Sequence, residues 1–231
     1  MNHNKALLVI DTQCGFMPAE EGVRTAMTGF GELPVPDGQN VVAPLNELTE
    51  VFLGHGQTVA TTQDWHPKET AHFSEEPNFV DSWPVHCVAH TPGAALHPEL
   101  IAADRASAHF YKGDVAAETP AEDNSYTGAL AHDADDPELL LPDFLEEKDI
   151  RRVYIGGLAL GDGDKHPLCV DSTAIDLHRK RFDVAVITDA VEAVLPENRQ
   201  RCFERLGKRG IRLLTAREAA VEVYNTPVEV R

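Results

Sequence analysis

Three residues of the sequence could supply a nucleophile, a carboxylate and a cation, and each stands at the end of a strand-like run or at the start of a helix. Cys169 stands at the expected start of a helix. Asp11 directly follows the apolar run 6–10, and Lys112 follows the strand-like run 108–111 in the same way. A thiol at a helix N-terminus lies where unpaired backbone N–H groups and the helix dipole favour the thiolate, the nucleophilic form. The sequence therefore offers a thiol, a carboxylate and an ammonium together.

A second group of residues has the composition of a metal site. Asp64 and His66 are two positions apart at the end of a strand-like run, so in extended chain both side chains project to the same side. His72 and His86 follow in the next loop. One carboxylate with two or three imidazoles suits one divalent transition metal ion, zinc, iron or manganese. The alternative is that these are ordinary histidines of a surface loop.

The elements that must position these residues alternate between two patterns. Short apolar runs are separated by amphipathic stretches of helix length, among them 40–55 and 170–181, which predicts an α/β fold in three α/β/α layers around a parallel sheet. Right-handed crossovers place the carboxyl ends of all parallel strands on one rim. The long loops 15–38, 67–98 and 114–137 are expected to build a binding site there.

Length and composition limit the classes of protein. The 231 residues fit a single domain, 1–231, and the formal net charge of −18 argues against a nucleic-acid partner and against binding to an anionic membrane. Four scattered cysteines form no C-x-x-C pair, and the apolar run 6–10 is too short for a signal peptide or membrane span. We therefore expect a cytoplasmic protein with free thiols.

With these residues assembled, the chain resembles the nicotinamidase/pyrazinamidase group of the isochorismatase-like cysteine hydrolases. The resemblance runs over most of the chain, and two of its segments, Asp64-Trp65-His66-Pro67 and Trp83-Pro84-Val85-His86-Cys87-Val88, point to the nicotinamidase branch. It also covers 8–13, 31–36, 72–74, 91–94, 111–113, 125–128, 157–159, 169–176 and 186–190.

The resemblance implies a Rossmann-like topology with a six-stranded parallel sheet and the hydrolysis of nicotinamide to nicotinate and ammonia. It implies that Cys169 is the nucleophile, that Asp11 accepts the proton of Cys169 and later passes it to the leaving amine, and that Lys112 supports their charged forms. Amide hydrolysis through a thioester needs these three contributions. Nicotinamide hydrolysis would place the enzyme in NAD salvage.

The same resemblance assigns the metal and substrate residues. Asp64, His66 and His86 are the implied metal ligands, and His72 is an additional ligand in some members. The implied metal, with zinc favoured over iron and manganese, binds the pyridine nitrogen directly or through water. Phe16 and Trp83 pack against the ring of a pyridine carboxamide substrate. Backbone N–H groups near Ala159 and at Cys169 form the oxyanion hole.

The sequence departs from the family between Ala159 and Cys169, where the nine residues 160–168 make a longer connection. This segment brings Asp162, Asp164, Lys165 and His166 close to the expected nucleophile. It is either a bulged surface loop or a source of an extra polar contact to the substrate. His90, four positions after His86, is either an ordinary loop histidine or part of the metal surroundings.

Two other functions compete with the first. One is a cysteine amidohydrolase of the same superfamily that acts on a carbamoyl or ureido compound, and these relatives commonly lack the full set of metal ligands. The other is a catalytically weak metal-binding regulatory protein, in which the longer segment before Cys169 has disabled the oxyanion hole. The family includes monomers, dimers and larger assemblies, so a homo-oligomer is compatible with the sequence.

Overall fold

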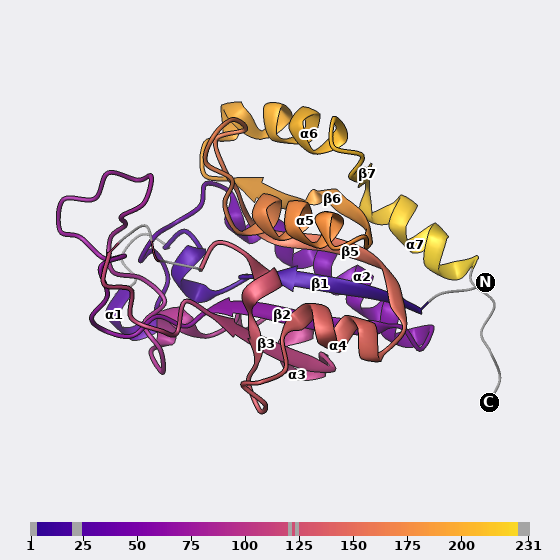
Figure 1. Cartoon of the computed structure of the whole chain (residues 1–231), viewed down its shortest axis with the longest axis horizontal. Coiled ribbons are helices and arrows are strands. Elements are labelled where there is room, and N and C mark those ends of the chain that lie inside the picture. The colour runs from indigo at the N-terminus through magenta and orange to yellow at the C-terminus, as the bar shows by residue number, and fades with distance from the viewer. Residues whose placement is uncertain (1–3, 20–24, 120–121, 123–124, 226–231) are drawn as a thin grey trace.

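A computed structural model describes residues 4–19, 25–119, 122 and 125–225 of the chain. Parts of the predicted loops 15–38 and 114–137 fall outside these residues. One sheet runs through the molecule (Figure 1). In spatial order, its strands are β4 (His132–Asp133), β3 (Ala108–Lys112), β2 (Thr58–Asp64), β1 (Asn4–Ile10), β5 (Ile150–Leu160), β6 (Asp183–Ala193) and β7 (Arg212–Leu214).

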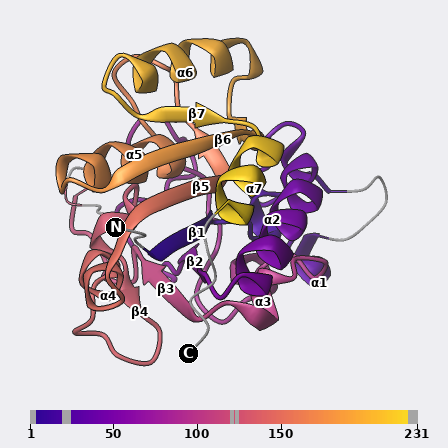
Figure 2. The ribbon, with the colours of Figure 1, turned by 90° about the vertical axis from the view of Figure 1, so that its right-hand side faces the viewer.

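Helices cover both faces of this sheet. Figure 2 shows α4, α5 and α6 on one side and α2, α3 and α7 on the other. The bounds of the helices are α1 (Thr25–Thr28), α2 (Val42–Gly54), α3 (Ala102–Arg105), α4 (Leu141–Glu147), α5 (Cys169–Arg179), α6 (Arg199–Gly207) and α7 (Ala216–Tyr224). The predicted class, a three-layer α/β/α fold, is confirmed.

The two layers of helices produce two hydrophobic cores. Leu8 and Ile10 of β1 belong to the core beneath α4, α5 and α6, whereas Leu7 and Val9 belong to the core beneath α2 and α7. Alternate residues of a strand point to opposite faces, so a central strand between two layers must be apolar at nearly every position. This explains why residues 6–10 form a continuous apolar run.

The sheet differs in one respect from the predicted six parallel strands. Among the described residues it has seven strands, because β4 pairs antiparallel with β3 at the edge, while the other pairs are parallel. β4 contains only His132 and Asp133. Two residues are too few to show the alternation that identifies a strand in sequence.

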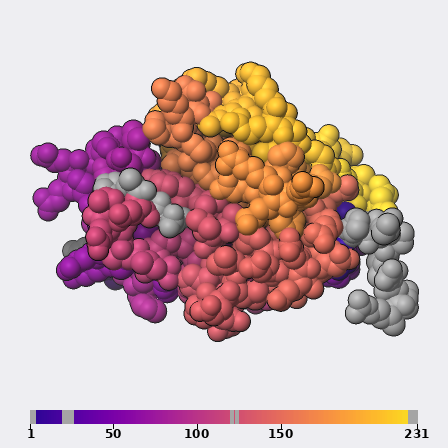
Figure 3. All heavy atoms as spheres, in the orientation of Figure 1, coloured from indigo at the N-terminus to yellow at the C-terminus, as the bar shows by residue number. Residues whose placement is uncertain are grey.

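The carboxyl ends of β1, β2, β3 and β5 meet on one rim, and the long connections gather there. The segment between β2 and β3 projects beyond this rim, as the purple to magenta spheres of Figure 3 show. The rim therefore provides the surroundings that the sequence predicts for a site. In the described part of the chain, no helix is long and apolar enough to span a membrane.

Candidate active site and metal centre

A cavity of about 310 Å³ opens on this rim. Its wall is mostly apolar, and the polar side chains in it include Asp64, His72, His86 and Cys169. Phe16, Trp83 and Ala159, the predicted substrate-binding residues, all line it. A small apolar cavity with a few convergent polar groups is typical of a site for a small molecule.

The predicted catalytic side chains lie together, with Cys169 in the wall of this cavity and Asp11 and Lys112 buried behind it. Nζ of Lys112 is 3.4 Å from Sγ of Cys169 and 2.8 Å from Oδ2 of Asp11. The same ammonium also contacts Oδ1 of Asp64 and the carbonyl oxygen of Ser125. Lys112 is thus a buried cation shared by a thiol and two carboxylates.

The parallel pairing of the strands brings these groups together. Lys112 is the last residue of β3 and is paired in register with Asp64, the last residue of β2. Asp11 follows β1 and donates its backbone N–H to the carbonyl oxygen of Thr62, at 3.1 Å. The hydroxyl of Thr62 donates to Oδ1 of Asp11, at 2.6 Å. The two carboxylates and the ammonium are therefore fixed by backbone pairing.

The pKa values of Asp11 and Lys112 are both raised, but for different reasons. Burial raises the pKa of Asp11, and the carboxylate of Asp64 adds to this effect while Lys112 opposes it. Burial acts to lower the pKa of Lys112, but the carboxylates of Asp11 and Asp64 outweigh it and hold that pKa well above its usual range. Lys112 therefore stays charged.

The thiol differs from the prediction made for a helix N-terminus. Burial raises the pKa of Cys169 well above its ordinary value, and the carboxylates of Asp11 and Asp64 raise it further, against the effect of Lys112. These effects favour the thiol in the resting site, whereas the helix start by itself favours the thiolate. Two neighbouring negative charges and desolvation outweigh the helix dipole, which amounts to only about half a charge.

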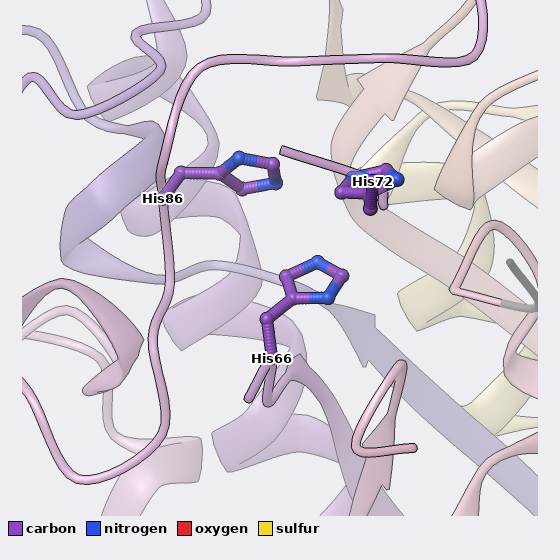
Figure 4. A group of neighbouring side chains, drawn as sticks. All are labelled: His66, His72 and His86. Carbon is purple, nitrogen blue, oxygen red and sulfur yellow. The ribbon is translucent and has the colours of Figure 1, made fainter. Parts of the chain in front are cut away.

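Three imidazoles form a separate cluster next to these groups. The side chains of His66, His72 and His86 point toward one another (Figure 4), and each offers a nitrogen that lies within 4.8 Å of the other two. All three residues are buried. Such a cluster of buried imidazoles differs from the exposed loop histidines of the alternative interpretation.

The donor set fits a divalent metal ion. Nδ1 of His86 lies 2.7 Å from the carbonyl oxygen of Pro84, and Nδ1 of His66 lies 3.2 Å from that of Gly113. A ring that donates through Nδ1 presents the lone pair of Nε2, which is the usual arrangement of ligating histidines. Burial lowers the pKa of His86 well below its ordinary value, and charge on His66 would lower it further, so the ring is neutral, as a ligand must be.

Asp64 lies between the two groups. Its Oδ2 atom is 3.9 Å from Nε2 of His66 and 4.0 Å from Nε2 of His86, while its Oδ1 atom contacts Lys112. One oxygen of Asp64 therefore faces the imidazoles, and the other contacts the ammonium of Lys112. This side chain links the candidate metal centre to the predicted catalytic groups.

The longer segment before Cys169 contributes almost nothing polar to the cavity. Of residues 160–168, all of which the structure describes, only Leu168 lines it. Asp164 instead pairs with Arg201 at 3.1 Å. The segment is thus the bulged surface loop of the first alternative. His90 is exposed, and its ring lies edge-on to Trp65 at 5.2 Å, outside the imidazole cluster.

Sequence reasoning missed two residues that support this site. The side chain of Gln13 accepts the backbone N–H of Asp64 and donates to its carbonyl oxygen, both at 2.8 Å. Glu32 accepts the backbone N–H of Cys87 at 2.8 Å, beside His86. The position of Gln13, two residues after Asp11, was a usable signal, whereas Glu32 is separated from its partner by 55 positions.

The fold and the site together are those of an α/β enzyme whose cavity holds a cysteine beside a buried lysine. Comparison with known proteins narrows this class. The chain is 30% identical to the nicotinamidase of Escherichia coli, over 91% of this chain and 94% of that protein. It therefore belongs to the nicotinamidase family, which confirms the resemblance noted in the sequence.

Two further relatives support this assignment. The nicotinamidase/pyrazinamidase of Mycobacterium tuberculosis is 28% identical, over 91% of this chain and 98% of that protein. The crystal structure of Pyrococcus horikoshii pyrazinamidase in complex with zinc is 29% identical, with a TM-score of 0.67 over 92% of this chain and 99% of that one. No protein-family model matches the chain.

Proposed function

We propose that this protein hydrolyses nicotinamide to nicotinate and ammonia through a cysteinyl thioester. The observation that carries the proposal is that Cys169, which lines a small apolar cavity, lies 3.4 Å from Lys112, which in turn contacts Asp11. The family relationship supplies the substrate class, because the similar proteins are nicotinamidases and pyrazinamidases.

Acylation requires that the thiol lose its proton as it attacks. Asp11 accepts this proton, and its raised pKa makes it a stronger base than an ordinary carboxylate. The sulfur forms a bond to the amide carbon, and the C–N bond breaks when Asp11 returns the proton to the departing nitrogen. Ammonia leaves, and the nicotinoyl group remains on Cys169 as a thioester.

Deacylation repeats these steps with water. Asp11 takes a proton from the water as its oxygen attacks the thioester carbon, and the C–S bond then breaks. The proton on Asp11 passes to the sulfur of Cys169. Nicotinic acid leaves, and it releases the second proton of the water to solvent to become nicotinate. Lys112 remains charged throughout and stabilises the anionic form that Asp11 or Cys169 adopts at each step.

The carbonyl oxygen becomes negatively charged in both steps. Ala159 lines the cavity together with Cys169, and the Leu158–Ala159 peptide bond preceding it is cis. We assign the oxyanion hole to the backbone N–H groups near Ala159 and at Cys169, because the N-terminus of α5 favours negative charge. The longer segment 160–168 leaves the contacts of Lys112 with Cys169 and with Asp11 in place.

We further propose zinc as the metal, held by Asp64, His66 and His86, with His72 as an additional ligand. When bound, the ion supplies a Lewis acid for the pyridine nitrogen. Phe16 and Trp83 hold the ring, since both line the cavity with 7% of their surface exposed. The apolar wall excludes water from the remainder of the ring.

Ammonia release from nicotinamide by the purified protein, alongside the variant Cys169→Ala, tests the proposal. We expect release by the parent and none by the variant, with intact nicotinoyl thioester at Cys169 trapped by acid quench and found by mass spectrometry. A folded, metal-loaded parent that releases no ammonia contradicts the proposal. Carbamoyl and ureido compounds would then be tried as substrates.

A further inference from the structure

The segment 160–168 is folded tightly although it is longer than its counterpart in the family. The side chain of Asp162 accepts the backbone N–H groups of Asp164, at 2.7 Å, and His166, at 3.1 Å. Gly161 passes so close to the end of this turn that a Cβ atom on it would lie 2.0 Å from the carbonyl oxygen of His166. The segment therefore closes on itself and brings its two ends together.

Both ends meet at one buried carboxylate, that of Asp171 in the first turn of α5. Oδ1 of Asp171 accepts the backbone N–H of Leu168 at 2.7 Å and that of Gly161 at 3.3 Å. The residue is 1% exposed. Leu168 directly precedes Cys169 and lines the cavity, so these hydrogen bonds end next to the nucleophile.

The opposite side of the segment rests on α6, which lies beside α5 on the same face of the sheet (Figure 2). The thiol of Cys202 donates to the carbonyl oxygen of Gly161 at 3.3 Å. Gly163 packs against the side chain of Arg201, which also binds Asp164. Gly161 is thus held at its N–H by Asp171 and at its carbonyl by Cys202.

We propose that Asp171 is a positioning residue for the reaction, which fastens both ends of the longer segment and thereby fixes Cys169 and the adjacent backbone N–H groups. This inference rests on the proposed function and deepens it, since it explains how the chain tolerates the longer segment. Asp171 touches neither substrate nor the reacting atoms and acts through Leu168 and Cys169. Small displacements of a nucleophile are costly, about a hundredfold in rate for 1 Å.

Charge on Asp171 strengthens the two hydrogen bonds that its carboxylate accepts, although burial disfavours the charged form. Hydrogen bonds to an ionised acceptor are roughly twice as strong as neutral ones. Burial raises the pKa of Asp171 to about 7, against the backbone N–H groups and the cation of Arg205. The other titratable groups at this place are Cys202 on α6 and Asp162 in the segment. Asp171 therefore changes its charge between pH 6 and pH 8.

The test compares Asp171→Asn and Asp171→Ala with the parent and with the control Asp164→Asn, which alters an exposed carboxylate of the same segment. We would measure kcat and KM for nicotinamide from pH 6 to pH 8, per active thiol. Asp171→Ala removes the oxygen that accepts both hydrogen bonds, so we expect kcat to fall about tenfold to a hundredfold with KM little changed.

Asp171→Asn keeps an acceptor oxygen but cannot ionise. The ratio of parent kcat to variant kcat should be near one at pH 6, where Asp171 is protonated, and rise several-fold by pH 8. Other ionisations cancel in this ratio, and a merely structural role would give a ratio independent of pH. Asp164→Asn should match the parent at every pH.

For Asp171→Asn, a ratio of parent kcat to variant kcat that does not change with pH overturns the proposal. If Asp171→Ala does not fold, the result for Asp171→Asn is sufficient by itself. A parent that releases no ammonia would refute the proposed function instead. In that case the role of Asp171 is tested by the rate at which iodoacetamide alkylates Cys169, because this measurement needs no substrate. In that measurement too, a parent-to-variant ratio that does not change between pH 6 and pH 8 refutes the role of Asp171.

Discussion

Nζ of Lys112 lies 2.8 Å from Oδ2 of Asp11, and neither side chain reaches solvent. A second carboxylate, that of Asp64, contacts the same ammonium. One buried cation therefore balances two buried anions, and this balance holds the site together as well as supporting the chemistry.

Replacing Lys112 should cost stability and activity together. In Lys112→Met two carboxylates remain buried without their cation, and we expect a loss of about 3–5 kcal/mol in the free energy of unfolding. Urea unfolding at pH 8 measures it. The matched control is Arg105→Ala, which breaks the exposed pair of Arg105 with Glu50 and should cost less than about 1 kcal/mol. Equal losses in the two variants would contradict this account.

Cys169 should react with iodoacetamide before the other thiols, because Cys14, Cys87 and Cys202 are buried, whereas Cys169 lines the cavity and is partly exposed. Its raised pKa has a further consequence. Below that pKa the thiolate fraction, and with it the alkylation rate, should rise about tenfold per pH unit between pH 7 and pH 9. Peptide mass mapping identifies the labelled residue. A fast rate that is independent of pH would show that the resting residue is a thiolate.

Removing an imidazole of the cluster should remove metal. Loss of a hydrogen-bond partner of a metal ligand weakens metal binding about 10–100-fold. Loss of the ligand itself, in His66→Ala or His86→Ala, should weaken metal binding at least as much. Metal content after dialysis against a mild chelator measures this without reference to activity. His90→Ala is the control, since that exposed ring packs on Trp65. Full metal content in His86→Ala would exclude this residue as a ligand.

Asp171 should make stability depend on pH. Its pKa of about 7 in the folded protein exceeds the ordinary value of 3.8. Between these values the folded chain holds a proton that the unfolded chain has lost, so stability falls as pH rises, by roughly 1.4 kcal/mol per unit. Relative to the parent, Asp171→Asn should therefore gain stability from pH 4 to pH 7, by roughly 4 kcal/mol at most.

Unfolding of both proteins in urea across this pH range checks the prediction. Asp164→Asn, whose carboxylate is exposed, should show no such gain. A difference between parent and Asp171→Asn that stays constant with pH would mean that the carboxyl titrates normally in the folded state.

The sequence by itself determined the class of fold and the types of residue at the site. Residues 6–10 are apolar at every position because β1 lies between two layers of helices, and this pattern is local and can be read directly. The placement of Asp11 and Lys112 after such runs predicted that they lie on one rim, because parallel strands end on the same side. The two-residue strand β4 left no comparable pattern.

Only the tertiary structure decided how these residues interact. The sequence favours a thiolate at Cys169, since the start of a helix is a local feature, but the pKa depends on burial and on Asp11 and Asp64, which are far away in the chain. Asp171 similarly appears in sequence as an ordinary acidic residue of a first helical turn. Its role follows from the return of Gly161 to the same carboxylate, and long-range contacts of this kind leave no periodic pattern in the sequence.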